Sequence, residues 1–299
     1  MNEWGAVSIA GQALIDSMDH GCHDVEWQGF PVRLIKQPWG ELLISLHGAQ
    51  VLHFRPANEH PVLWLTAQPK SFPGAIRGGV PLCWPWFADH PADAALPAHG
   101  VARTGKWRLE HEQITESGGC WLMTPEASLW PDLALSLRIT VGQNGLAISL
   151  TTDNVGLQAA TLTQALHSYL AISARNSISI EGLEGYAYFD KLQAMAQFNL
   201  EGSVDATQEI DRVFNHAESV LLVDHGWQRS LRIGKRYSGS TVVWNPGVSA
   251  KGVVDIGLDQ VDAFVCIEAA NTGCVDPVVL LSGESICLET QFTIEPYVK

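Results

Sequence analysis

Two arginines and two histidines lie in one segment that is too irregular for a helix or a long strand. The segment runs from Ile76 to Arg103, and Gly, Pro and Trp residues fill much of it. Arg77 and Arg103 are its cations, and His90 and His99 are its imidazoles. Such a segment can hold cationic and imidazole groups against an aromatic wall, as a sugar or phosphate pocket requires. The alternative is a Pro- and Gly-rich connection whose Trp residues cap the core.

Two further segments carry groups that could transfer protons. His167 lies within the apolar run Ala165–Leu170, where strand alternation would place it on the same side as Tyr169. Glu268 directly follows the apolar run Phe264–Ile267. Burying a carboxylate is costly unless it is paired or used, and burial would raise its pKa toward the range of a general base. The alternatives are a core histidine with a satisfied hydrogen bond and a strand-end glutamate that reaches water.

Asp190 is the third candidate, in the segment Gly185–Lys191, where it stands beside aromatic residues. The alternative there is a surface pair of Asp190 and Lys191. The sequence shows no nucleophile elbow, no P-loop and no dinucleotide fingerprint. One histidine and one carboxylate on a β-sheet scaffold therefore suit proton transfer in opposite directions on a polyhydroxylated substrate.

Composition limits the partners. The 299 residues are 46% hydrophobic and 17% charged, which is ample material for a large core. A net charge of −14 argues against nucleic acid and anionic membranes as partners, because both require a basic surface. An anionic substrate must then be bound by a local cluster of Arg or Lys. The chain shows no apolar run of about 20 residues and no secretory signal, so we expect a cytoplasmic protein.

The cysteines and the short His/Cys cluster do not predict a metal site. Six cysteines are scattered without a CxxC pair, which is typical of free thiols in a reducing compartment. The segment His20–His23 holds two histidines and a cysteine, but nothing elsewhere in the sequence completes a set of three or four ligands. We therefore expect neither a metal nor an organic cofactor.

Strand patterns dominate the elements that must position these groups. Leu133–Val141 and Leu146–Leu150 alternate in polarity around Gly142–Gly145, which predicts a hairpin. Val278–Leu281 and Ile286–Ile294 repeat that pattern near the C-terminus. Shorter candidate strands are Leu42–Leu46, Val62–Leu65, Ser177–Ile180 and Ser240–Trp244. Only Ile9–Met18 and Ser203–Val213 suggest short helices. The pattern predicts an all-β fold, a large antiparallel β-sandwich with few short helices that forms one domain over residues 1–299.

The order and spacing of these motifs resemble the aldose 1-epimerase-like family over nearly the whole chain. Within the family, the motifs resemble the hexose-6-phosphate branch, the glucose-6-phosphate 1-epimerases. The matching segments are Leu46–Pro56, Val62–Leu65, Arg77–Arg103, Ala165–Tyr169, Gly182–Asp190, Trp244–Pro246 and Cys266–Glu268. One departure is Gly247, where the family commonly carries Trp. This departure concerns the shape of one pocket wall.

The resemblance implies a galactose mutarotase-like sandwich with a cleft on one concave sheet. It implies that His167 is the general acid on the sugar ring oxygen and Glu268 the general base on the anomeric hydroxyl. By the same resemblance His99 and Asp190 bind sugar hydroxyls, and Arg77 and Arg103 bind the sugar or its phosphate. No cofactor is implied.

These expectations lead to one predicted function and several alternatives. We expect a monomer that interconverts the anomers of D-glucose 6-phosphate or a related hexose 6-phosphate. The alternatives are an aldose 1-epimerase that acts on free sugars and a non-catalytic carbohydrate-binding sandwich. A glycosidase would need two suitably placed carboxylates, for which Glu268 and Asp190 are the candidates, and His167 would then have no role.

Overall fold

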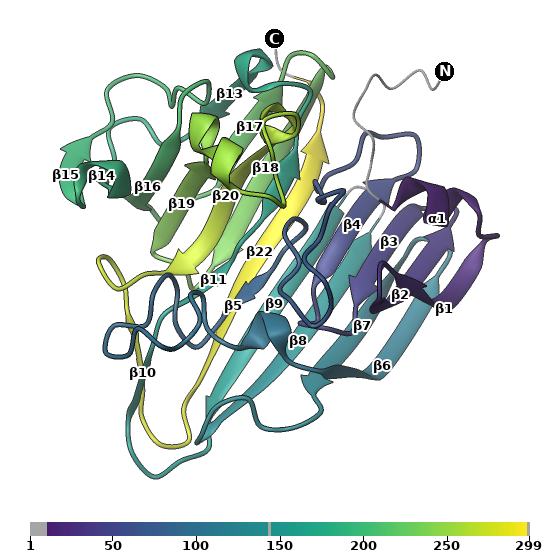
Figure 1. Ribbon diagram of the computed structural model, residues 1–299, viewed down its shortest axis with the longest axis horizontal. Helices are drawn as coiled ribbons and strands as arrows, with labels where there is room; N and C mark the ends of the chain where they lie inside the picture. Colours follow the sequence, from purple (N-terminus) through teal and green to yellow (C-terminus); the bar gives the residue numbers. More distant parts are fainter. Residues whose placement is uncertain (1–10, 143–144, 298–299) are drawn as a thin grey trace.

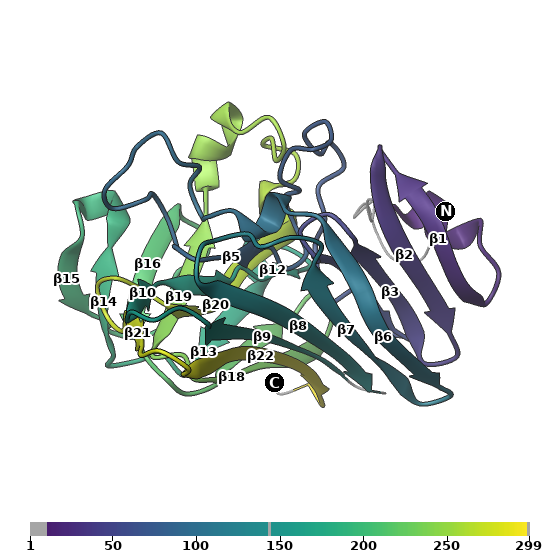
Figure 2. The same ribbon diagram turned by 90° about the horizontal axis from the view of Figure 1, so that it is seen from below.

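Strands dominate the computed structural model, which describes residues 11–142 and 145–297. The one α-helix among these residues, α1, spans Gln12–Asp16, within the predicted helix Ile9–Met18, whose first two residues lie outside the described ranges. Every ladder between named strands is antiparallel, and the strands form two eight-stranded sheets, a four-stranded sheet and a two-stranded ladder (Figures 1 and 2). The all-β prediction is confirmed.

The first eight-stranded sheet, the site sheet, carries the candidate residues. Its order is β15 (Ala196–Asn199), β14 (Ala187–Asp190), β16 (Ile210–Asn215), β19 (Ser240–Asn245), β20 (Phe264–Asn271), β11 (Gln164–Leu166) and β5 (Leu82–Cys83), with β12 (Tyr169–Ala171) also paired to β20. Strand β20 lies in the middle of the sheet and is buried along its whole length. A central, fully buried strand is a rigid platform for functional side chains.

The second eight-stranded sheet covers the inner face of the site sheet. Its order is β13 (Ile178–Glu181), β17 (Val220–Asp224), β18 (Arg229–Arg236), β22 (Ser285–Glu295), β9 (Gly145–Asn154), β8 (Leu133–Gly142), β7 (Gly118–Pro125) and β6 (Trp107–Thr115). Buried residues alternate with exposed or half-buried ones in β8 and with half-buried ones in β9, so half of the side chains point into the core between the sheets. The predicted hairpin is confirmed, with pairing out to Gly142 and Gly145; the two residues between them lie outside the described ranges.

A four-stranded sheet lies at the end of the molecule remote from β14 and β15 (Figures 1 and 2). It consists of β1 (Gly21–Trp27), β2 (Phe30–Gln37), β3 (Gly40–Ser45) and β4 (Val51–Pro56). One of its faces packs on the main core through Leu42 and Phe54, and the other packs on α1 through Leu43 and Ile15. Whether the whole chain is one domain stays a prediction.

The residues Ser203–Val213 do not form the predicted helix. The structure places a turn at Asp205, whose carboxylate accepts hydrogen bonds from the backbone N–H and the hydroxyl of Thr207, followed by strand β16 from Ile210. A side chain that accepts from the backbone two residues later competes with helical hydrogen bonding. Strand β16 pairs with β14 and β19, so the second half of the segment is part of the site sheet.

Two other predicted strands take part in the fold differently. Val62–Leu65 forms only single bridges, from Leu63 to Leu170 and from Leu65 to Gly78. Near the C-terminus, β21 (Val278–Leu280) pairs with β10 (Ala160–Leu162), whereas β22 pairs with β9 and β18, so the two neighbouring strands do not form a hairpin. Shorter predicted strands at residues 42–46, 177–180 and 240–244 are confirmed within one or two residues.

No helix of the described residues is long and apolar enough to cross a membrane.

Candidate active site

The strands β11, β12 and β20 bring His167 and Glu268 together. Leu166 pairs with Ala269, and Tyr169 pairs with Cys266, so the register is the same on both sides of the gap between β11 and β12. His167 lies in that gap, opposite Glu268, and donates its backbone N–H to Pro81 O at 3.1 Å. Residues opposite each other on antiparallel strands point to the same face of a sheet. The side chains of His167 and Glu268 therefore share the outer face of the site sheet.

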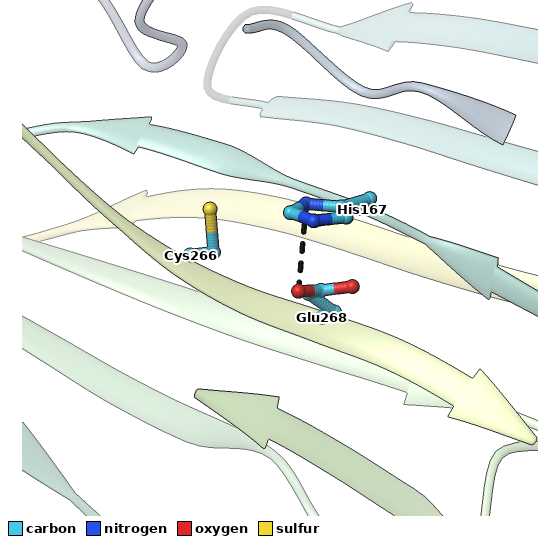
Figure 3. Close-up of side chains that lie close together, drawn as sticks. All are labelled: His167, Cys266 and Glu268. Carbon is cyan, nitrogen blue, oxygen red and sulfur yellow. Dashed lines mark ion pairs between the residues drawn. The ribbon is translucent and has the colours of Figure 1, made fainter. Parts of the chain in front are cut away.

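The two side chains are in contact. Nδ1 of His167 lies 3.4 Å from Oε1 of Glu268 (Figure 3). Glu268 is 1% exposed and His167 is 9% exposed. Neither carboxylate oxygen of Glu268 has a hydrogen-bond partner among the described residues, and neither has Nδ1 of His167. Buried polar atoms are nearly always paired in folded proteins, so this pair is kept available for another group.

The surroundings shift both proton affinities. Burial and the neighbouring carboxylate of Asp211 raise the pKa of Glu268 well above its usual value. Burial and the positive charges of Arg77 and Arg103 lower the pKa of His167 well below its usual value, with His99 acting in the same direction. These opposite shifts favour the state in which the pair holds one proton between its two groups.

His99 is brought to this pair by a sharp return of its loop. Its φ is 64°, and the following Gly100 has a φ of 72° and lies so close to Trp84 O that a Cβ there would be 2.0 Å from that oxygen. Only glycine fits such an approach in the left-handed region. The return places the His99 ring 5.7 Å from the His167 ring. Nδ1 of His99 accepts from the N–H of Ala88 at 3.3 Å, which leaves Nε2–H as the donor of the neutral ring.

The charge state of His99 follows from its neighbours. Burial and the cations Arg103, Lys191 and Arg77 lower the pKa of His99 to about 3. A neutral imidazole that accepts at Nδ1 can donate a hydrogen bond from Nε2 at neutral pH. This suits His99 to a neutral substrate oxygen.

Arg77 is fixed by two partners. Its Nε lies 2.9 Å from Oδ1 of Asp255, and its Nη1 donates to the hydroxyl of Tyr169 at 3.1 Å. The Tyr169 ring stacks on the His167 ring with centroids 4.7 Å apart and planes at 8°. The predicted placement of His167 and Tyr169 on one side is confirmed, although the strand is interrupted between them. Arg77 thus reaches the proton-transfer pair through one intervening ring.

Arg103 has a different environment. It lies in the 3-10 turn η1 (Ala102–Thr104), and its Nη2 donates to Ala98 O at 2.7 Å. Among the described residues no carboxylate lies within ion-pair distance of it. Its charge nevertheless lowers the pKa of both His99 and His167. Arg103 is therefore a cation near the pair whose charge is not neutralised by an acid.

The structure does not bring Asp190 to the outer face with the others. Its register with Arg212, and that of Arg212 with Val243 and Val243 with Ile267, places Asp190 on the inner face. Its carboxylate accepts from the N–H of Leu192 at 2.9 Å and lies 3.4 Å from Nε of Arg212. These contacts cap the turn η3 (Lys191–Gln193). They leave the predicted hydroxyl contact of Asp190 without support from the geometry.

Two residues near the pair, Lys191 and Asp211, were not identified as site residues from the sequence. Lys191 Nζ lies 3.0 Å from Oδ2 of Asp211, and Asp211 shares the outer face with Trp244 and Cys266 by register. Lys191 also acts on the pKa of His99 and Glu268. A strand interpretation of residues 210–215 would have placed Asp211 on one face with Val213, but the helical interpretation of that segment hid it.

Possible metal ligands gather at the same place. His167, Cys266 and Glu268 form the only group of three such side chains found among the described residues. The segment His20–His23 does not contribute to it, and Nε2 of His23 instead lies 3.1 Å from Asp19 O.

Comparison with known proteins agrees with this geometry. The profile of the aldose 1-epimerase family matches residues 33–293. A protein of Escherichia coli strain K12 with the provisional name glucose-6-phosphate 1-epimerase is 31% identical over 250 residues, which cover 79% of this chain and 82% of that protein.

Solved structures give the same result for the fold. A Salmonella typhimurium protein, provisionally described as a mutarotase, superposes with a TM-score of 0.84 at 26% identity over 92% of this chain and 94% of that one. Galactose 1-epimerase from Lactobacillus acidophilus superposes with a TM-score of 0.67 at 14% identity over 94% of this chain and 100% of that one. The second likeness concerns the fold alone.

Proposed function

The chain belongs to the aldose 1-epimerase family, and we propose that it interconverts the α and β anomers of D-glucose 6-phosphate or a related hexose 6-phosphate. The observation that carries this proposal is the buried contact of His167 with Glu268, 3.4 Å apart, in which neither carboxylate oxygen is occupied. An acid and a base that are held together, and are free toward a ligand, are what ring opening of a cyclic hemiacetal requires.

The reaction begins with the proton of the pair on His167. Transfer of the shared proton from Glu268 to His167 converts two neutral groups into a carboxylate and an imidazolium. Glu268 then removes the proton from the anomeric O1 hydroxyl while His167 protonates the ring oxygen O5. The C1–O5 bond breaks, its electron pair stays on O5, and a carbonyl forms between C1 and O1. Concerted transfer avoids both a free alkoxide and a free oxocarbenium-like species.

Reclosure exchanges the two roles. Rotation about the C1–C2 bond presents the other face of the aldehyde to the O5 hydroxyl. His167 removes the proton from O5 as it attacks C1, and Glu268 returns a proton to O1. The pair recovers its starting charge, and the product is the other anomer. His99 supports the step by donating Nε2–H to a sugar oxygen, because its low pKa keeps the ring neutral.

We assign the phosphate to Arg103, the cation near the pair that has no acidic partner among the described residues. A net charge of −14 repels a sugar phosphate at long range, so binding depends on short contacts. Arg103 has no carboxylate partner among the described residues, and its guanidinium can bind a phosphate oxygen pair. Arg77 is held by Asp255 and Tyr169 beside the catalytic rings, which suits a contact with the sugar itself. The E. coli relative carries the name of a hexose-phosphate epimerase, in agreement with this assignment.

Anomer exchange measured by saturation-transfer NMR tests the proposal directly. Glucose 6-phosphate, glucose and galactose are compared at equal concentration, and we expect the purified protein to accelerate exchange of glucose 6-phosphate well beyond that of the two free sugars. Equal efficiency on glucose would favour an aldose 1-epimerase that acts on free sugars. Binding of sugar without any acceleration of exchange would favour a non-catalytic carbohydrate-binding protein.

A further inference from the structure

Cys266 has no part in the proposed reaction, yet it lies beside both groups that transfer protons. It precedes Glu268 by two residues on β20, so both side chains point to the outer face of the site sheet. Figure 3 shows its sulfur on the same side of the strand as the contact between His167 and Glu268. The three ligating atoms, one from each residue, all lie within 4.8 Å of one another.

The cluster has the composition of a three-ligand zinc site. Sulfur, imidazole nitrogen and carboxylate oxygen are the atoms that Zn²⁺ binds in proteins, and three protein ligands with an open fourth position are typical of its accessible sites. Both oxygens of Glu268 and Nδ1 of His167 lack hydrogen-bond partners among the described residues. These atoms are at least nine-tenths buried, so they are buried polar groups that are available to a ligand.

The geometry requires only a small contraction. Bond lengths of about 2.0–2.3 Å place tetrahedral ligand atoms roughly 3.3–3.7 Å apart. The contact from His167 to Glu268 already has this length, at 3.4 Å. The 4.8 Å limit on the remaining pairs then leaves about 1 Å of side-chain adjustment. Because Cys266 and Glu268 share one strand, rotation of their side chains is enough and the sheet need not move.

We propose that His167, Cys266 and Glu268 bind a thiophilic divalent cation, with Zn²⁺ as the preferred ion, and that the bound ion inhibits the enzyme. Binding of the ion rests on the cluster alone, whereas inhibition also rests on the proposed function of His167 and Glu268. The ion displaces the thiol and carboxyl protons and takes the electron pairs that the reaction uses. Because the ion would be held by the two groups that act on the sugar, it should compete with the sugar phosphate.

The choice of cation provides the first test of the proposed metal site. Mg²⁺ and Ca²⁺ prefer sets of oxygen ligands, and this cluster offers one carboxylate among softer atoms. Zn²⁺, Cd²⁺ and Co²⁺ accept the thiolate and imidazole. We expect Zn²⁺ to inhibit anomer exchange competitively with the sugar phosphate, EDTA to restore the rate, and Mg²⁺ at the same concentration to have no effect.

Binding is measured separately from activity with Co²⁺. The purified wild-type protein is titrated with Co²⁺ alone while its absorption spectrum is recorded. We expect a thiolate-to-metal charge-transfer band and the intense visible bands of four-coordinate cobalt, saturating at one ion per chain, and Zn²⁺ should abolish them. A spectrum without the sulfur band would overturn the proposal whatever the enzyme's substrate proves to be.

Two substitutions of Cys266 and a matched control locate the site. Cys83 is also fully buried on the outer face, paired with Ala165 on the neighbouring strand, but it is not part of the cluster. Loss of a group that hydrogen-bonds to a metal ligand already costs roughly 10–100-fold in affinity, and Cys266 is proposed as a ligand itself. Cys266→Ala and Cys266→Ser should therefore each weaken Zn²⁺ inhibition by at least about a hundredfold. Cys83→Ala should leave the inhibition constant unchanged.

Each variant is compared with its own rate in EDTA, so a change in basal turnover does not affect the result. Inhibition of Cys266→Ala at the wild-type Zn²⁺ concentration would overturn the proposal, as would loss of inhibition in Cys83→Ala. If both Cys266 variants fail to fold, the wild-type cobalt spectrum decides. If the Co²⁺ band appears but Zn²⁺ does not compete with the sugar phosphate, the cluster binds metal and the proposed catalytic role of His167 and Glu268 is wrong.

Discussion

His167 and Glu268 face each other at the interruption between β11 and β12, where Nδ1 lies 3.4 Å from Oε1. The register on either side of the interruption is unchanged, so the two side chains remain opposite partners although the strand is broken between them. The break sends the His167 N–H to Pro81, which belongs to the segment that also carries Arg77. One local irregularity thereby joins the proton-transfer pair to the irregular segment of the sequence.

Replacement of either member of the pair should stop catalysis and spare the fold. A positioned proton-transfer group contributes about a hundredfold or more, so Glu268→Gln and His167→Asn should each lower turnover by at least that factor. Glu268 has no hydrogen-bond partner among the described residues to lose, and Gln keeps the size and neutrality of the protonated carboxyl that its raised pKa favours. Saturation-transfer NMR gives the rate, and thermal denaturation gives the stability.

Binding of the sugar phosphate serves as the control for these two variants. Both proteins should retain affinity for glucose 6-phosphate, because the arginines remain in place. A soluble variant with a near-normal rate of exchange would remove its residue from the mechanism.

The two arginines should separate phosphate binding from sugar binding. Charge-assisted hydrogen bonds contribute on the order of 1.5–3 kcal/mol, so loss of one should weaken affinity roughly ten- to a hundredfold. Arg103 has no acidic partner among the described residues, so Arg103→Met should weaken glucose 6-phosphate while leaving activity on glucose nearly unchanged. Arg77 is fixed by Asp255 and Tyr169 beside the catalytic rings, so Arg77→Met should impair both substrates.

Kinetics on the two substrates decide between these assignments. The measured quantity is the ratio of kcat/KM for glucose 6-phosphate to that for glucose, which should fall for Arg103→Met and stay constant for Arg77→Met. The reverse result would exchange the roles of the two residues.

Period-two alternation was sufficient to predict the sandwich and its long strands. Residues 133–141 and 146–150 alternate cleanly because one face of β8 and β9 packs on the core and the other is more exposed. The apolar runs around them made His167 and Glu268 candidates, and the family resemblance assigned their roles. Their meeting in space could not be predicted, because it depends on the pairing of β11 with β20, which brings together residues about a hundred positions apart.

The site residues that escaped prediction depend on tertiary context. Asp211 was hidden because a turn-forming Asp205 precedes β16 and the segment resembled a helix. Asp255 lies in a loop with no periodic pattern, and only its 2.9 Å contact with Arg77 identifies it as a neighbour of the site. Asp190 was placed in the site by its motif, yet strand parity puts its side chain on the other face and its neighbour Lys191 contacts Asp211.

A buried ion pair in the four-stranded sheet should make stability depend on pH. Burial alone would raise the pKa of Glu41, but His53 and a two-point contact from Arg55 lower it to about 2. This folded-state pKa is below the ordinary value of 4.5, so the ionised carboxylate stabilises the fold. The contribution is fully present above pH 4.5 and is lost as the pH falls through about 2.

Denaturant unfolding of Glu41→Gln measures this contribution. We expect the free energy of unfolding to fall by about 1–2 kcal/mol at pH 7, after allowance for the partial exposure of Arg55, and the difference from wild type to shrink as the pH drops below 4.5. Glu110→Gln is the matched control, because Glu110 pairs with Arg108 on the exposed surface. A pH-independent difference for Glu41→Gln would show that its carboxylate is not stabilised by these partners.

Gly247, the position at which the sequence departs from the pattern expected by resemblance, should tolerate no side chain. Its φ is 48°, and a Cβ at this position would lie 2.8 Å from the backbone of Glu209. The left-handed conformation alone costs a residue with a side chain about 1–2 kcal/mol, and the contact adds to it. Gly252 ends the same turn η4 (Gly247–Gly252) and has nothing within 4 Å of its Cβ position. Gly247→Ala should therefore lower the Tm by several degrees, whereas Gly252→Ala should leave it nearly unchanged.

The same substitution should also reach the catalytic site through packing. Ala250 of η4 packs in a cluster with Phe264 and Trp244, and the Trp244 ring lies 5.8 Å from the His167 ring. A shift of η4 forced by a side chain at residue 247 would move this wall, so Gly247→Ala should raise KM for glucose 6-phosphate more than it lowers kcat. Equal Tm values for the two glycine variants would mean that the segment around Glu209 yields to a side chain, and the pocket wall could then accept the larger residue of the family.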